Sequence, residues 1–307
     1  MLNDFNIENK KVVVFGGSGL VGSNLVKRLK KINCDLFYPT SSECDLFNNE
    51  QLSCWFKEKK PDLVYMAAGK VGGILDNEKY PVEYCYDNTI MGINVIKNSY
   101  ENNVKRLVYF SSSCVYPAGI ESPMAEDLLL SGKIEPTNEG YALAKILVSN
   151  LCGYYNKEYG TDYITIVPCN IYGTGDNYDL EKGHVIGALI NKFYNHKEQI
   201  EIWGHGRQRR EVMHIEDLVD ATIFLTRKYK SNEPINVGIG EDYSIKEIVD
   251  IIKKIVDYKG DIIYNTDRPI GVFRKLLDVT KIHSLGWKHK ISIEKGLENT
   301  IKNYLNS

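Results

Sequence analysis

The stretch KVVVFGGSGLVGSNLVKRLKK, residues 11–31, joins an apolar strand to an amphipathic helix through a glycine-rich turn. Gly16, Gly19 and Gly22 allow that turn to pass close to a pyrophosphate, whose charge is held by amide groups at the helix N-terminus. Glycines alone could mark only a tight turn, but the strand before them and the helix after them favour a dinucleotide site. The residues that we assign to this part of the site are Gly16, Ser18, Gly19, Leu20, Val21 and Gly22.

Short apolar segments alternate with helical stretches from this turn to about Pro168. The expected strands are residues 11–17, 35–39, 62–68, 106–112 and 162–169. The alternation predicts an α/β fold with a doubly wound parallel sheet of the Rossmann type. We expect residues 1–170 to form the dinucleotide-binding domain. Residues 171–307 should form mainly a smaller α/β substrate-binding lobe, with helices near 184–196 and 244–256 and with some segments returning to the Rossmann domain.

The composition of the 307 residues argues against several classes of protein. A net charge of -2 gives no basic field for nucleic acid. No apolar run approaches the roughly 20 residues of a membrane helix, and the N-terminus lacks the apolar core of a signal peptide, so we expect a cytoplasmic protein with no membrane partner. The 7 cysteines contain no C-x-x-C and the 6 histidines no i, i+4 pair, so we expect neither a disulfide framework nor a metal.

Ligands of a doubly wound sheet bind beyond the carboxyl ends of its strands. The residues expected to meet the cofactor at the third and fifth strands are Ala67, Ala68, Gly69, Pro168, Asn170 and Ile171. At the second strand, Ser41 and its neighbours replace the acidic residue that usually holds the ribose of NAD. Hydroxyls there favour NADP(H), although no arginine stands at that turn and Glu43 is nearby. Asp45 and Leu46 are expected to meet the adenine.

Tyr141 and Lys145 are four residues apart, so they share one face if residues 138–159 are helical. An ammonium beside the phenol should lower the pKa of Tyr141, which could then transfer a proton, and Lys145 could also hold the nicotinamide ribose. Ser112, at the end of the fourth strand, could donate to the substrate oxygen. With 21 tyrosines in the chain, the spacing could also mark an ordinary solvated helix face.

These motifs resemble the extended short-chain dehydrogenase/reductase family, and within it the GDP-L-fucose synthases, over essentially the whole chain. The phrases that carry the resemblance are AAGKVGGI (67–74), SSCVYP (112–117), PMAEDLLLSG (123–132), EPTNEGYALAK (135–145) and RREVMHIEDL (209–218). The resemblance implies a GDP-linked 4-keto-6-deoxy sugar as substrate. It further implies epimerisation at C3 and C5, followed by NADPH-dependent reduction of the C4 ketone.

The resemblance also implies roles for single residues. Cys114 takes the role of base and His184 that of acid, with His184 also near the cofactor; a packed thiol and a helix cap are their competing interpretations. Arg210 is the candidate ligand of the diphosphate, because a guanidinium can bind two phosphate oxygens. The residues expected to line the sugar and guanine are Ser113, Asn170, Val185 and Trp203, although Trp203 could belong only to the core.

Two other functions stay open. The same scaffold could reduce C4 of a GDP-4-keto-heptose for a bacterial surface polysaccharide, with a separate enzyme carrying out the epimerisation. A non-catalytic dinucleotide sensor could also keep this fold, but intact Ser112, Tyr141 and Lys145 argue against it. The family further suggests a homodimer, with helices near 83–102 and 138–159 forming a shared bundle.

Overall fold

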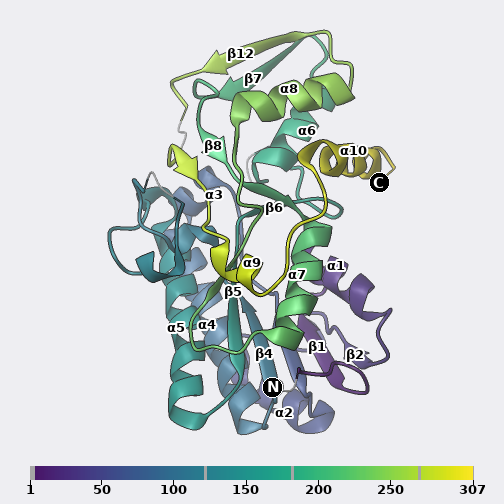
Figure 1. The fold of residues 1–307 in the computed structure, drawn as a ribbon, viewed down its shortest axis with the longest axis vertical. Helices are drawn as coiled ribbons and strands as arrows, with labels where there is room; N and C mark the ends of the chain where they lie inside the picture. Colours follow the sequence, from purple (N-terminus) through teal and green to yellow (C-terminus); the bar gives the residue numbers. More distant parts are fainter. Residues whose placement is uncertain (1–3, 121–122, 181–182, 269–270, 307) are drawn as a thin grey trace.

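The structure is a computed structural model, which describes residues 4–120, 123–180, 183–268 and 271–306. Its centre is a six-stranded parallel sheet (Figure 1). The strands are β1 (Lys11–Phe15), β2 (Asp35–Phe37), β3 (Leu63–Met66), β4 (Arg106–Phe110), β5 (Tyr163–Pro168) and β10 (Ile235–Val237). Their order is β2-β1-β3-β4-β5-β10, so the chain reverses its direction of winding between β1 and β3. A crevice for a ligand is expected at that point, beyond the strand ends.

Helices cover both faces of this sheet, as a doubly wound fold requires. Val12 and Val14 of β1 belong to a core shared with α1 (Leu20–Leu29) and α7 (Ile215–Lys228). Val13 and Phe15 point to the opposite face. That face is covered by α2 (Asn49–Lys59), α4 (Pro81–Glu101) and α5 (Glu139–Tyr159). The sequence-based prediction of a Rossmann-type sheet is confirmed.

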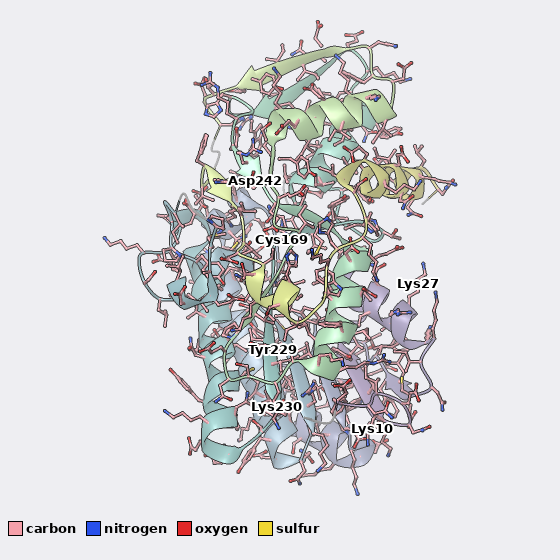
Figure 2. All side chains as sticks on the ribbon, viewed as in Figure 1. Lys10, Lys27, Cys169, Tyr229, Lys230 and Asp242 are labelled. Carbon is pink, nitrogen blue, oxygen red and sulfur yellow. The ribbon has the colours of Figure 1, made fainter. Side chains whose placement is uncertain are left out.

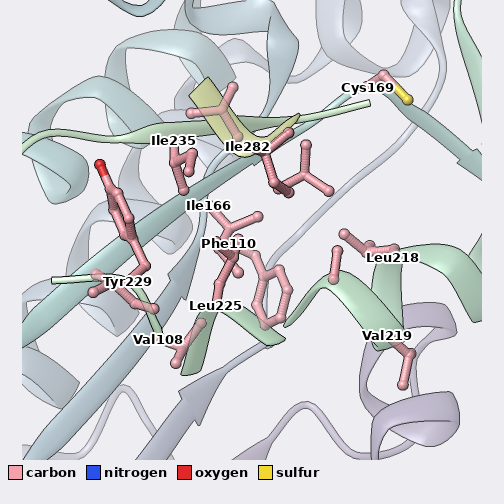
Figure 3. Close-up of a cluster of buried hydrophobic side chains, with 14 of the residues drawn as sticks. Val108, Phe110, Ile166, Cys169, Leu218, Val219, Leu225, Tyr229, Ile235 and Ile282 are labelled. Carbon is pink, nitrogen blue, oxygen red and sulfur yellow. The ribbon is translucent and has the colours of Figure 1, made fainter. Parts of the chain in front are cut away.

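Figure 3 shows a section of the first of these cores. Val108 and Phe110 of β4 and Ile166 of β5 pack with Leu218 and Leu225 of α7. Ile235 of β10 closes the cluster at the edge of the sheet, together with Ile282 of α9 (Thr280–Ser284). A segment more than 60 residues after β5 thus completes the sheet.

The strands end a few residues earlier than the sequence suggested. β1 ends at Phe15, and Gly16 has a φ of 81° that ends regular pairing. Residues 169–172 do not extend β5. Instead β6 (Asn170–Tyr172) pairs with β9 (Val212–His214), which the sequence did not predict.

A second, smaller α/β lobe lies beyond the carboxyl ends of the strands, at the top of Figure 1. It has its own core of apolar side chains. Its elements are α6 (Val185–Asn195), β7 (Gln199–Trp203), α8 (Ile245–Ile255), β12 (Asp261–Asn265) and α10 (Ile293–Leu305). The expected helices at 184–196 and 244–256 are α6 and α8. Ser244 and Glu247 form a capping box that fixes the start of α8.

A small three-stranded sheet lies beside the junction of the two parts. It consists of β11 (Tyr243–Ser244), β8 (Arg209–Arg210) and β13 (Arg274–Lys275). Figure 2 places Cys169, which directly follows β5, between the large sheet and the upper lobe, with Asp242 above it.

Buried Glu211, directly after β8, accepts hydrogen bonds from Ile239 N at 2.6 Å, Gly240 N at 2.8 Å and Leu277 N at 2.8 Å. These bonds tie β8 to the segments after β10 and β13.

The remaining described elements are short. They are α3 (Ile74–Lys79) and the 3-10 helices Ser113–Val115, Glu126–Leu128 and Pro136–Asn138. No helix within the four described ranges is both long and apolar enough to cross a membrane.

Candidate active site

The glycine turn has the shape that a pyrophosphate requires. A Cβ on Gly16 would lie 2.5 Å from Ala68 N, and one on Gly22 would lie 2.0 Å from Gly16 O, so both positions need glycine for packing. At Gly19, by contrast, an added Cβ would meet only Gly16 O, at 3.6 Å. The start of α1 therefore presents open space and free amides, and these residues fit a dinucleotide phosphate.

The other residues assigned to the cofactor surround this turn. Gly69 lies beside Lys145, whose Nζ would be 3.5 Å from an added Cβ. Asn88 of α4 fixes this loop, because its side chain bonds both Lys70 N and Lys70 O at 3.0 Å. The side chains of Leu20, Val21, Leu46 and Ile171 pack against the cores, so these residues present backbone rather than side chain to a ligand.

The turn after β2 is built from hydroxyls and one carboxylate. Thr40 donates from its N and Oγ1 to Glu43 Oε2, at 2.8 and 2.9 Å, and Ser41 is exposed. The backbone bond from Thr40, followed by its hydroxyl, lowers the pKa of Glu43. Glu43 thus stabilises the turn as an anion and leaves the Ser41 hydroxyl accessible.

Tyr141 and Lys145 lie on one face of α5, as the spacing predicted. Lys145 is buried, its Nζ donates to Phe110 O at 2.8 Å, and it lies 5.6 Å from the centroid of the Tyr141 ring. Burial lowers the pKa of Lys145 to about 8. Lys145 is therefore still mainly an ammonium at neutral pH, but it gives up a proton more readily than an exposed lysine.

The expectation that Lys145 lowers the pKa of Tyr141 is wrong for the substrate-free site. Burial raises the pKa of Tyr141, the Cys114 charge adds to this, and the hydrogen bond with Ser112 opposes it only in part. The ammonium is instead held by the Phe110 carbonyl at the end of β4. Tyr141 is consequently a phenol that keeps its proton until a charge arises beside it.

Cys114 lies at the same strand end, in a 3-10 turn. Its backbone N donates to Ser112 Oγ at 3.3 Å, and two side chains point at its sulfur: Lys275 Nζ at 3.1 Å and Asn138 Nδ2 at 3.4 Å. Burial acts to raise the pKa of Cys114, but Lys275, with smaller effects of Ser112 and Arg210, outweighs burial and lowers it. A thiol with two such donors is suited to act as a thiolate base.

His184 is the N-cap residue of α6, on the lobe side of the cleft. Its side chain accepts no hydrogen bond from the backbone N–H groups of the first turn, so His184 holds the N-cap position without capping the helix through its side chain. The residue reaches solvent, yet surrounding protein atoms lower the pKa of its imidazole, and the charge of Lys275 adds to this. The side chain is thus partly enclosed by protein while one part of it stays accessible. The lowered pKa favours the neutral form of the imidazole.

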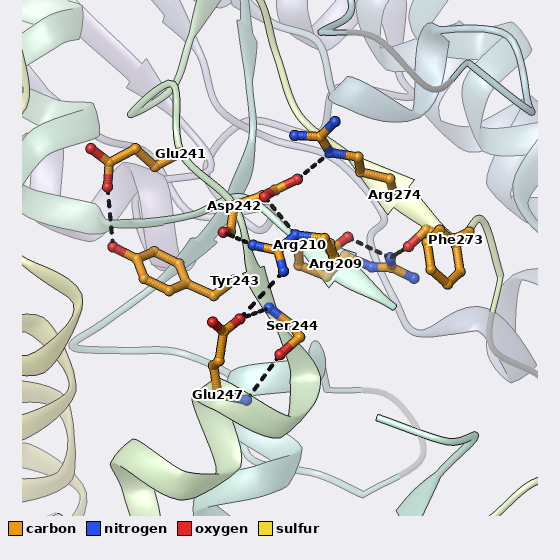
Figure 4. Close-up of polar contacts among 9 residues, drawn as sticks. All are labelled: Arg209, Arg210, Glu241, Asp242, Tyr243, Ser244, Glu247, Phe273 and Arg274. Atoms are coloured by element: carbon orange, nitrogen blue, oxygen red, sulfur yellow. Dashed lines mark hydrogen bonds and ion pairs between the residues drawn. The ribbon is translucent and has the colours of Figure 1, made fainter. Parts of the chain in front are cut away.

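Arg210 extends the cationic side of the cleft. Its Nη1 donates to Arg209 O at 2.8 Å, as Figure 4 shows. Burial lowers the pKa of Arg210 to about 10, while Cys114 and Glu135 act in the opposite direction. The guanidinium thus lies within electrostatic range of the thiol.

The predicted sugar and guanine residues come from different parts of the fold. Buried Ser113 shares a small pocket with Cys114, Glu135 and Lys275. Asn170 begins β6, and Val185 is the first residue of α6. Trp203 is half-buried between the side chains of Lys192 and Arg268, each about 5.5 Å from its ring centroid. It is therefore not a core residue. Direct contact of these residues with a substrate stays a prediction.

Sequence reasoning missed Lys275, Asn138 and Asn88. Lys275 is 161 positions from Cys114, and no spacing rule connects them. Asn138 lies within the quoted phrase EPTNEGYALAK, so its proximity to Tyr141 could have drawn attention.

A separate hollow, lined by Asn156, Thr161 and Glu233, lies at the far end of α5 and contains none of the candidate residues. Within the described ranges no group of three or more His, Cys, Asp or Glu side chains could hold a metal ion.

Comparisons with known proteins identify the family of this chain. Residues 12–238 match the NAD dependent epimerase/dehydratase family. The chain is 39% identical to GDP-L-fucose synthase of Sinorhizobium fredii, over 98% of this chain and 97% of that one. It is also 39% identical to GDP-L-colitose synthase of Yersinia pseudotuberculosis, over 96% and 98% of the two chains.

A solved structure has the same fold. The chain superposes on the GDP-mannoheptose C4 reductase of Campylobacter jejuni with NADP bound, with a TM-score of 0.90 and 36% identity. The match covers 97% of this chain and 98% of that one. The similarity therefore extends over both the large sheet and the smaller lobe.

Proposed function

The chain belongs to the NAD dependent epimerase/dehydratase family, and we propose that it reduces the C4 ketone of a GDP-4-keto-6-deoxy sugar with NADPH and epimerises C3 and C5. The observation that carries the proposal is that Cys114 and Tyr141 lie close enough together for their charges to interact. A base for epimerisation and an acid for reduction are then within reach of one bound sugar. This combined activity is that of a GDP-L-fucose synthase, the name of a relative 39% identical to this chain.

Reduction uses the groups at the end of β4 and on α5. NADPH, bound along the glycine turn, supplies the hydride that C4 receives. Tyr141 donates its proton to the C4 oxygen, and its raised pKa keeps that proton in place until the oxygen becomes negative. Ser112 donates a second hydrogen bond to the same oxygen. Lys145, with a pKa of about 8, stabilises the resulting phenolate and helps to return its proton.

Epimerisation uses the opposite walls of the cleft. The C3 and C5 protons are acidic because both carbons flank the C4 carbonyl. The Cys114 thiolate removes one of these protons, the electron pair of the C–H bond moves toward the C4 oxygen, and Ser112 and Tyr141 hold the enolate. His184 then returns a proton to the other face. Because its pKa is lowered in the free protein, this role needs a nearby negative charge, which the diphosphate of the substrate provides.

The nucleotide part of the substrate occupies the lobe side. Arg210 binds the diphosphate, which compensates its half-buried guanidinium for the solvent that surrounding protein atoms displace. The residues that we place around the sugar and the guanine are Ser113, Asn170, Val185 and Trp203. In this arrangement residues 1–170 bind the dinucleotide, and residues 171–307, apart from the segments that return to the sheet, bind the sugar nucleotide.

A second candidate is C4 reduction of a GDP-4-keto-heptose in surface polysaccharide biosynthesis, without epimerisation. The similarity to the heptose C4 reductase of Campylobacter jejuni favours it. The Lys275 contact with Cys114 favours the bifunctional proposal, because a reductase alone needs no activated thiol.

We also propose a homodimer that works in the cytoplasm, where NADPH and nucleotide sugars are available. The large apolar side chains exposed on α4 and α5 support the dimer, because water-exposed residues of this kind on adjacent helices indicate a contact surface. They are Val82, Tyr86, Tyr100, Leu143, Leu147, Tyr154 and Tyr159.

Product analysis tests the proposal. The protein is incubated with NADPH and either GDP-4-keto-6-deoxy-mannose or a GDP-4-keto-heptose, and the products are identified by NMR. We expect NADPH oxidation with the hexose and an L-configured product inverted at C3 and C5. Turnover of the heptose alone, without inversion, would favour the second candidate. The absence of NADPH oxidation with both ketones would refute both.

A further inference from the structure

The small sheet β11-β8-β13 places two cations on one face and two on the other. In its register Arg274 pairs with Arg209, and Lys275 pairs with Arg210. Neighbouring residues of a strand point to opposite faces, whereas paired residues share a face. Asp242 binds both Arg209 and Arg274, as Figure 4 shows. Lys275 and Arg210 therefore point together to the other face, where Cys114 lies.

Lys275 is held close to the sulfur from a different part of the fold. Its Nζ lies 3.1 Å from Cys114 Sγ, whereas Cys114 belongs to the turn after β4. Asp242, with only 5% of its side chain exposed, anchors the neighbouring Arg274 and so fixes the position of β13. The contact is thus supported by the sheet and does not depend on a freely mobile side chain.

We propose that Lys275 is the positioning residue that keeps Cys114 as a thiolate ready to remove the C3 and C5 protons. The inference rests on the proposed epimerase function, and it assigns the activation of the thiol to one ammonium. The proton balance is simple: the thiol gives its proton to solvent, Lys275 stays protonated, and the thiolate later takes one proton from carbon. Loss of that ammonium leaves a half-buried sulfur among protein atoms, and the thiol then holds its proton more firmly.

Other titratable groups near Cys114 also influence the pKa of its thiol. The groups that interact with Cys114 or with Lys275, or line the same pocket, are Arg210 of β8, Tyr141 of α5, Glu135, His184 at the start of α6, and Arg274. The ammonium of Lys275 donates a hydrogen bond directly to the sulfur. Replacing Lys275 should therefore change the titration of the thiol more than replacing a distant lysine.

The test measures the thiol directly, without substrate. Iodoacetamide labelling of Cys114 is followed against pH by mass spectrometry, with exposed Cys54 as the reference thiol in the same sample. We expect Lys275→Met to move the Cys114 inflection upward by about 1–3 pH units, the effect of an opposite charge at this distance. Lys275→Arg should restore most of the shift. Lys290→Met removes an exposed lysine that pairs with Asp220 and should leave the profile unchanged.

Catalysis provides a second readout. With GDP-4-keto-6-deoxy-mannose in deuterated water, Lys275→Met should exchange the C3 and C5 protons at least tenfold more slowly at neutral pH and recover at higher pH. Reduction of an already epimerised ketone should be spared. An unchanged labelling profile in Lys275→Met, or a higher KM for the nucleotide sugar with no shift, would overturn the inference. If Lys275→Met does not fold, Lys275→Gln is measured with the same criteria. Absence of exchange in the wild type would instead refute the epimerase half of the function, whatever the labelling shows.

Discussion

At Tyr141 the decisive property is a proton held tightly because surrounding protein atoms raise the pKa of the phenol. Replacing Tyr141 by Phe removes the acid but retains the ring that packs edge-on against Tyr84. We expect the kcat for reduction to fall about 10²–10⁴-fold, the usual contribution of a general acid, with little change in NADPH affinity. NADPH oxidation and cofactor titration measure the two quantities. Tyr159→Phe, at the exposed end of the same helix, is the control. Equal activity of both variants would contradict the assigned role.

Asp176 is a second residue whose charge depends on the fold. It is buried in the loop after β6, Asn177 N donates to its Oδ1, and its Oδ2 has no partner. Burial raises its pKa from 3.8 to about 7, with the Asn177 bond opposing. Between these pH values the folded protein binds the extra proton, so the stability contributed by Asp176 falls as the pH rises.

Asp176→Asn removes this titration. We expect the free energy of unfolding of the variant, relative to wild type, to increase from pH 4 to pH 7 by up to about 1.4 kcal/mol per pH unit. Urea unfolding across this range measures the difference. A constant difference between the two proteins would show that Asp176 does not titrate there.

The sequence could predict that Tyr141 and Lys145 lie together but not their protonation. Spacing alone placed Tyr141 and Lys145 on one helix face. The direction of the Tyr141 pKa shift depended on burial and on the Phe110 carbonyl that holds the lysine, and neither is visible in a local motif. Lys275 escaped prediction for the same reason, because its partner comes from a distant segment.

At the scale of elements, the β11-β8-β13 sheet depends on Asp242. Burial acts to raise the pKa of Asp242, but Arg274 and Arg209 outweigh it and lower it. Its stabilising charge is therefore present at neutral pH and is lost only as the pH falls through the lowered value. Asp242→Asn should destabilise the protein by about 1–3 kcal/mol, as expected for hydrogen bonds to a charged group.

The same substitution should also affect the thiol, because β13 positions Lys275. We expect the Cys114 labelling inflection to move upward, but less than in Lys275→Met. Urea unfolding and thiol labelling check the two effects. A variant as stable as wild type with an unchanged thiol would show that Asp242 does not fix this strand.

Helices were easier to predict than strand partners. The expected helix at 138–159 is α5, Glu139–Tyr159, because its periodicity and the αL glycine at 160 are local signals. β10 could not be assigned to the sheet, because residues 235–237 have no local feature that selects β5 as their partner. The pairing of β6 with β9 likewise depends on the arrangement of the whole chain.

At the scale of the whole molecule, the exposed face of α4 and α5 predicts self-association. Leu147 is 46% exposed on α5 and would be covered in the proposed dimer. Leu147→Arg should give a monomer in size-exclusion chromatography with light scattering, because a charge in an apolar interface stays unpaired. Leu305→Arg, at an exposed leucine on α10, should remain dimeric. A monomeric wild type would refute the dimer.

The central claim is that one cleft performs both proton exchange at carbon and reduction of the ketone. The most direct measurement incubates the wild type and Cys114→Ser with GDP-4-keto-6-deoxy-mannose in deuterated water without NADPH, followed by NMR. Our account predicts deuterium at C3 and C5 with the wild type and none with the variant, which should still reduce an already epimerised ketone when NADPH is added. Absence of deuterium at both carbons with the wild type would contradict it.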